Sequence, residues 1–139
     1  MSQDEEEKFV YRSSYTNPRP YIPQALSEIE DQLGSMMLKS PHFKDRTGYF
    51  PDLSLESSFF KLNSGLDRMR EKLGEDVYVK AIELSGRAKA LFLQATDITS
   101  EKTREGNRLL DEIDQLINAV RRHRYESGLK DDEGEVTGD

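Results

Sequence analysis

The chain has 139 residues, of which 35% are apolar and 34% charged, with a formal net charge of −7 and no cysteine. This length predicts one domain, and the lack of cysteine excludes disulfides and thiolate metal sites. No run approaches the roughly 18 apolar residues of a membrane span. The acidic start, MSQDEEEKFVYRSS, lacks the basic and then apolar pattern of a secretory signal. We therefore expect a cytoplasmic protein.

The acidic charge is concentrated at the C-terminus. Residues 126–139 contain six acids and one lysine, a net charge of −5, whereas residues 54–125 contain twelve acids and thirteen bases. Domains that bind DNA or RNA usually have a basic stripe and a positive bias. We therefore expect neither nucleic acid nor a membrane among the partners. A tail so poor in apolar residues is expected to be disordered.

The first predicted helix follows an N-terminal arm, residues 1–22, whose prolines, serines and charges predict no regular structure. Pro23 suits the first position of a helix. The helix is expected to run to about Leu38 and to end at Ser40-Pro41. Its apolar residues recur at steps of three and four and are Leu26, Ile29, Leu33 and Met36. This spacing predicts an amphipathic helix.

The second predicted helix has the clearest pattern. Ser54 can cap its N-terminus and Gly74 its C-terminus. Its apolar residues are spaced 4, 3, 4, 3, 4 and are Leu55, Phe59, Leu62, Leu66, Met69 and Leu73. This stripe predicts one continuous helix whose apolar side is buried within the chain. The alternative is a seam between two copies, because coiled coils have the same repeat.

Two further helices are predicted over residues 75–95 and 101–125. The first has a face of alanine and serine with Gly86 beside it, which would let another helix approach closely. Thr99 or Ser100 can cap the second, and Gly128 can close it. Because only about two residues separate the second and third helices, these two are expected to form an antiparallel hairpin.

These elements predict an all-α protein, with an antiparallel four-helix bundle in residues 23–125. The N-terminal arm is expected to be disordered or loosely packed. The alternative arrangement has the first helix packed obliquely over a three-helix core.

Motifs that carry chemistry are missing from the sequence. Neither His42 nor His123 has a glutamate three residues before it, as a di-iron bundle requires. Phosphate-binding glycine loops and the GxSxG nucleophile motif are also missing. We therefore predict no catalytic residue, no cofactor and no metal site. An enzyme that uses His42 with Asp45 remains the third alternative.

The connection between the first two helices, KSPHFKDRTGYFPDLS over residues 39–54, is long for a compact helical domain. Its aromatic residues predict either a loop pinned across the domain or a docking surface for a partner. In the docking hypothesis the loop acts together with acids of the first helix. The candidate partner-binding residues are then Glu28, Glu30, Asp31, Phe43, Asp45, Arg46, Tyr49 and Phe50.

Size, acidity and the missing catalytic motifs are typical of small helical proteins that bind another protein, such as bacterial immunity proteins, antitoxins and inhibitors. The function expected from the sequence is therefore stoichiometric blocking of a basic partner protein, by a monomer or a homodimer. The alternative, from a different class, is a structural or assembly subunit that associates through its helices.

Overall fold

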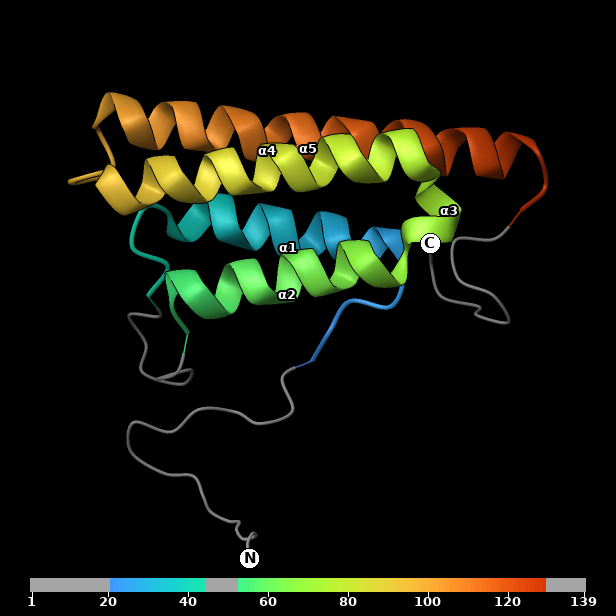
Figure 1. Ribbon diagram of the computed structural model, residues 1–139, viewed down its shortest axis with the longest axis horizontal. Helices are drawn as coiled ribbons and strands as arrows, with labels where there is room; N and C mark the ends of the chain where they lie inside the picture. Colours follow the sequence, from blue (N-terminus) through green and yellow to red (C-terminus); the bar gives the residue numbers. More distant parts are fainter. Residues whose placement is uncertain (1–20, 45–52, 130–139) are drawn as a thin grey trace, which may run out of the picture.

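The computed structural model describes residues 21–44 and 53–129 (Figure 1). These residues form five α-helices and no strand, which confirms the predicted all-α class. None of these helices combines the length and apolar character needed to cross a membrane. The helices are α1 (Leu26–Lys39), α2 (Leu55–Arg68), α3 (Arg70–Leu73), α4 (Glu75–Gln94) and α5 (Glu101–Glu126).

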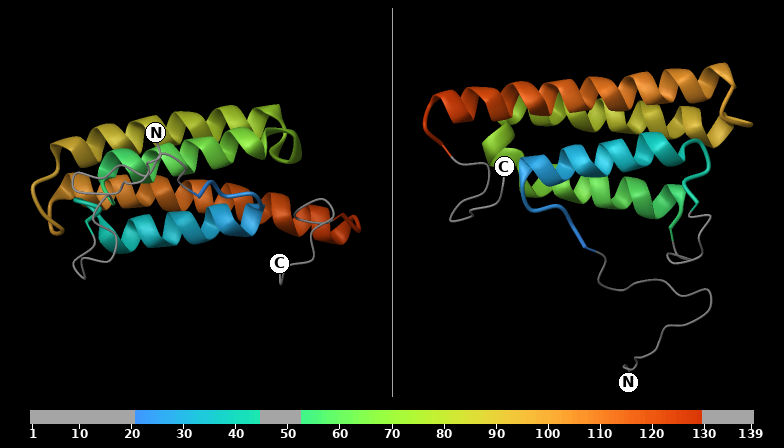
Figure 2. Two further views of the ribbon diagram at one scale, coloured as in Figure 1. Left: turned by 90° about the horizontal axis from the view of Figure 1, so that it is seen from below. Right: turned by 180° about the vertical axis from the view of Figure 1, so that it is seen from behind.

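The four long helices lie side by side in two layers, α4 with α5 and α1 with α2 (Figures 1 and 2). Each long helix contacts two others: α1 and α4 each contact both α2 and α5. Successive long helices run in opposite directions along the molecule (Figure 1). The antiparallel relation predicted between the second and third helices is therefore confirmed.

The core contains the apolar stripes predicted for the first two helices, together with apolar residues of α4 and α5. In α1 the four predicted apolar residues are at most 1% exposed, and in α2 Phe59, Leu62 and Leu66 are equally buried. Met69 and Leu73 are 7% and 5% exposed. Burial of this stripe within the chain is confirmed except at Leu55, which is partly buried, so its buried residues are not available for a seam between two copies.

The second predicted helix is not continuous. It is interrupted at Met69, whose backbone leaves the helical range with φ −95° and ψ 11°, and it resumes as the single turn α3. The bend brings α3 into contact with both α4 and α5 at the end of the molecule (Figure 1). It also keeps Leu73 on the core while the chain turns towards α4. Gly74 ends the segment with φ +88°, in the left-handed region that glycine adopts most readily.

Several helix ends follow the sequence, but α1 begins at Leu26, with Ala25 as its N-cap, and not at Pro23 as predicted. The Ser54 hydroxyl accepts a hydrogen bond from the Ser57 N–H, and the Ser57 hydroxyl accepts one from the Ser54 N–H, which forms a reciprocal capping box. Of the two residues predicted to cap the last helix, Ser100 does so, by accepting from the Thr103 N–H.

Close approach of α4 and α5 depends on a different glycine from the one predicted. A methyl group at Gly106 in α5 would lie 2.7 Å from the ring of Phe92 in α4. Gly86, by contrast, is exposed, and a methyl group there would have no atom of the described residues within 4 Å. The small residues Ala81, Ser85 and Ala88 are buried as expected, but the role given to Gly86 was wrong.

Candidate functional site

Phe43, a predicted docking residue, is a core residue in the structure. Its side chain is fully buried, and its backbone has φ +58°, in the left-handed region. Its ring packs edge-on against Phe59 and Phe92, with ring centroids 5.9 Å and 5.0 Å away. The surface role predicted for Phe43 is therefore wrong, since it anchors the connection to the core instead. The other predicted loop residues, Asp45, Arg46, Tyr49 and Phe50, lie outside the described residues.

The acids predicted on α1 are mostly engaged within the chain. Glu28 accepts hydrogen bonds from the Tyr21 hydroxyl at 2.6 Å and the Gln24 N–H at 2.8 Å. Glu30 forms an ion pair with Arg121 of α5 at 2.5 Å, and its side chain is only 15% exposed. Asp31 is exposed.

The structure does not bring these α1 acids together with Phe43. The three acids lie in the first half of α1, whereas Phe43 follows the opposite end of that helix. The predicted combination of α1 acids with residues of the connection therefore does not form one site with Phe43.

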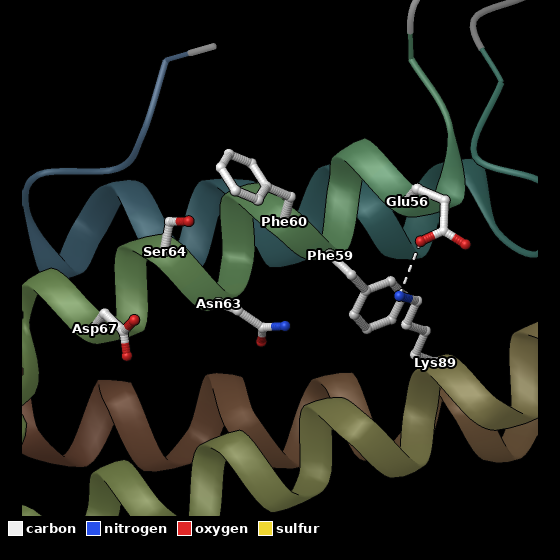
Figure 3. A pocket seen from close by; sticks show the side chains of 7 residues that line it. All are labelled: Glu56, Phe59, Phe60, Asn63, Ser64, Asp67 and Lys89. Carbon is white, nitrogen blue, oxygen red and sulfur yellow. Dashed lines mark ion pairs between the residues drawn. The ribbon is translucent and has the colours of Figure 1, made fainter. Parts of the chain in front are cut away.

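An open groove of about 430 Å³ lies between α2 and α4 (Figure 3). Phe60 stands on its α2 side and is 54% exposed, although it is a large aromatic residue. The adjacent Phe59 is 1% exposed and lines the inner part of the groove, with its ring directed from α2 towards α4, whereas the Phe60 ring points away from α4 (Figure 3). The lining residues are Glu56, Phe59, Phe60, Asn63, Ser64, Asp67 and Lys89.

Polar contacts connect the two helices along the groove. At the end of the groove near the start of α2, the Lys89 ammonium lies 2.9 Å from the Glu56 carboxylate (Figure 3). In the middle the Ser85 hydroxyl donates to the Asn63 side-chain oxygen at 2.7 Å. The Asn63 amide is thereby held between the helices, and Lys89 is the only cation among the described residues that line this groove.

At the other end of the groove a chain of contacts begins at Asp67 and continues onto α3 and α4. The Tyr78 hydroxyl donates to the Asp67 carboxylate, and this hydrogen bond raises the pKa of Tyr78 above its usual value. The Arg70 guanidinium lies 4.3 Å from the centre of the Tyr78 ring and donates two hydrogen bonds to Glu75, at 3.0 Å and 2.6 Å. The hydrogen bonds from Arg70 lower the pKa of Glu75.

These groups suit binding through shape and charge. Two carboxylates, Glu56 and Asp67, lie at opposite ends of the groove, with the exposed ring of Phe60 between them. Within residues 21–44 and 53–129 no group of three histidine, aspartate or glutamate side chains is arranged to hold a metal ion. A basic peptide segment with an apolar side chain matches the carboxylates and the ring.

The sequence contained a signal for this groove that the analysis of apolar spacing missed. Glu56, Phe60, Asn63 and Asp67 are spaced 4, 3, 4 along α2, parallel to the buried stripe and one position from it. Lys89 and Ser85 are likewise one turn apart on α4. Without the tertiary structure, however, nothing indicated that these two rows face one another.

Comparison of the chain with protein-family models, with curated proteins and with solved structures finds no match.

Proposed function

We propose that this protein is a binding module that recognises a basic segment of a partner protein through the groove between α2 and α4. In this proposal α1, α2, α4 and α5 act as an antiparallel four-helix bundle, a rigid frame for the groove. The observation that carries the proposal is the exposed ring of Phe60 beside an open groove with a carboxylate at each end.

The aromatic ring supplies the apolar part of the recognition. Aromatic residues are enriched in protein interfaces and often contribute most of the binding energy, because they bury a large area with few rotatable bonds. Phe60 is 54% exposed in a helix whose other phenylalanine is 1% exposed. A partner side chain that covers Phe60 removes this area from water.

The carboxylates supply the charged part. Glu56 and Asp67 are both exposed, so a lysine or arginine of the partner can reach either of them beside the contacts that they already make with Lys89 and Tyr78. The formal charge of −7 adds a long-range attraction for a basic partner. Such attraction speeds association and falls as salt is added. The mode of action expected from this chemistry is stoichiometric, as in an inhibitor or immunity protein.

The experiment is affinity capture with the intact chain and two single variants, followed by binding kinetics with the captured protein. Phe60→Ser removes the exposed ring from the groove. Tyr125→Ser removes another exposed aromatic residue, 82% exposed and at the far end of α5, and is the matched control. We expect a basic protein that binds the wild type and Tyr125→Ser equally, and Phe60→Ser at least about tenfold more weakly.

Equal binding by all three proteins would refute the groove as the binding site. Association rates that do not change between low and high salt would refute the electrostatic part of the proposal, even if Phe60 matters.

A further inference from the structure

Two glycines within the long helices have no role in the packing of the described residues. A methyl group at Gly34 in α1 or at Gly86 in α4 would meet no described atom within 4 Å. Glycine inside a helix is about 1 kcal/mol less favourable than alanine. Gly65 and Gly106 differ, because a methyl group there would press on Pro23 and Phe92 respectively.

Gly86 is the centre of an exposed row on α4 that we call the outer face of α4. Val79 and Leu93 in this row are 54% and 62% exposed, which is unusual for large apolar residues. Figure 2 (left) shows α4 along the edge of the molecule, with one side turned away from the other helices. The outer face consists of Val79, Glu83, Gly86, Arg87, Ala90 and Leu93.

The outer face is complementary to itself when two copies meet in antiparallel orientation with Gly86 at the twofold axis. Val79 and Leu93 are each seven positions from Gly86, which is nearly two helical turns, so each would lie opposite the other in the second copy. At the axis the two glycines, with Ala90 beside them, would allow the backbones to approach closely.

The charges of the outer face match in the same arrangement. Glu83 and Arg87 lie on one flank of the row, three positions before and one position after Gly86. A twofold axis places this flank next to the same flank of the second copy. Each Glu83 would therefore meet Arg87 of the other copy, giving two ion pairs close to the axis.

Gly34 has no such symmetry around it. The positions seven residues on either side are Ser27 and Pro41, and those four residues on either side are Glu30 and Leu38. These pairs join unlike residues and bring no opposite charges together. A twofold contact centred on Gly34 is therefore disfavoured, which makes this position a matched control.

We propose that the chain forms an antiparallel homodimer through the outer face of α4, with Gly86 at the axis. This inference is independent of the proposed function, because the groove between α2 and α4 is lined by other residues. A contact made by one helix from each copy is small. The dimer is therefore expected to dissociate on dilution.

The first test uses the fact that the chain contains no cysteine. In the proposed dimer the two residues at position 86 are close enough for a disulfide, which requires Cα atoms about 4.4–6.8 Å apart. Under mild oxidation we expect Gly86→Cys to form a covalent dimer at least about tenfold faster than Gly34→Cys. Equal rates for the two variants would overturn the proposal.

The second test exchanges the charges. Glu83→Arg leaves two bases, and Arg87→Glu two acids, on each copy, so each variant alone should dimerise at least about tenfold more weakly than the wild type. Mixed together, they restore both ion pairs and should form a heterodimer. Sedimentation over a range of concentrations measures how strongly each variant, and the mixture, dimerises.

Both charge variants change only exposed side chains, and circular dichroism checks that they fold. A mixture that stays as monomeric as its components would overturn the proposal, as would a wild type that stays monomeric at all concentrations. The latter result is expected if the outer face binds a different protein. Phe60→Ser should dimerise like the wild type, which separates this inference from the proposed function.

Discussion

The two sides of α4 differ in whether a glycine at the helix surface has a neighbouring segment packed against it. On the inner side, α5 places Gly106 against the ring of Phe92, and there is no room for a methyl group. On the outer side, Gly86 is exposed among the described residues and lies between Val79 and Leu93. The comparison teaches that a glycine in a helix marks a close approach only if another chain segment lies against it. For Gly106 that segment is α4, and for Gly86 we propose a second copy of α4.

The largest effect is expected on the inner side, from Phe92→Ala. Phe92 is 3% exposed and packs against both Phe43 and Phe59. Removing a buried phenylalanine ring destabilises a protein by about 3–5 kcal/mol, because apolar contacts are lost and a cavity remains. Urea denaturation should show this loss in the free energy of unfolding, while the dependence of that free energy on urea concentration stays unchanged. A loss below about 1 kcal/mol would contradict the packing of this ring in the core.

Gly106→Ala is expected to destabilise the fold by about 1–3 kcal/mol, although alanine favours helices, because its methyl group would overlap the Phe92 ring. The double variant Gly106→Ala with Phe92→Leu separates the causes. If the overlap is responsible, Gly106→Ala should be less harmful when Phe92 is already leucine. Additive losses of stability in the double variant would show that the two residues do not collide.

Gly86→Ala, the matching change on the outer side, should have the opposite sign. Measured on the monomer, at concentrations where no dimer forms, it should raise the free energy of unfolding by about 0.5–1 kcal/mol. Gly34→Ala should do the same. If Gly86→Ala destabilises the monomer while Gly34→Ala stabilises it, the outer face of α4 is packed within the chain, and the comparison fails.

The smallest effect is expected for the exposed pair of Arg70 and Glu75 at the start of α4. Hydrogen bonds from Arg70 lower the pKa of Glu75 in the folded state. The stability from this pair is therefore present above the unfolded pKa of a glutamate and is lost as the pH falls through the lower folded value. Glu75→Gln should lower the urea midpoint slightly at pH 7 and leave it unchanged at pH 2. An equal change of the urea midpoint at pH 7 and pH 2 would show that the ion pair does not stabilise the fold.

Sequence reasoning located the helices because apolar spacing, caps and glycine positions are local properties of the chain. The spacing from Leu26 to Met36 predicted α1, Ser54 was predicted as a cap, and Ser100 was one of two candidates for the cap of α5. The break at Met69 was missed, since the apolar repeat continues through it and only the packing of α3 at the end of α4 and α5 explains the bend.

The sequence by itself therefore determined the all-α class, the helix caps at Ser54 and Gly74, and most of the buried apolar positions, because these depend on residues a few positions apart. Only the tertiary structure decided that Phe43 belongs to the core, that Phe60 faces a groove, and that Gly106 rather than Gly86 admits a neighbouring helix. The reason is physical. The burial of a side chain between two helices depends on which distant segment lies opposite, and apolar spacing within one helix does not encode that pairing.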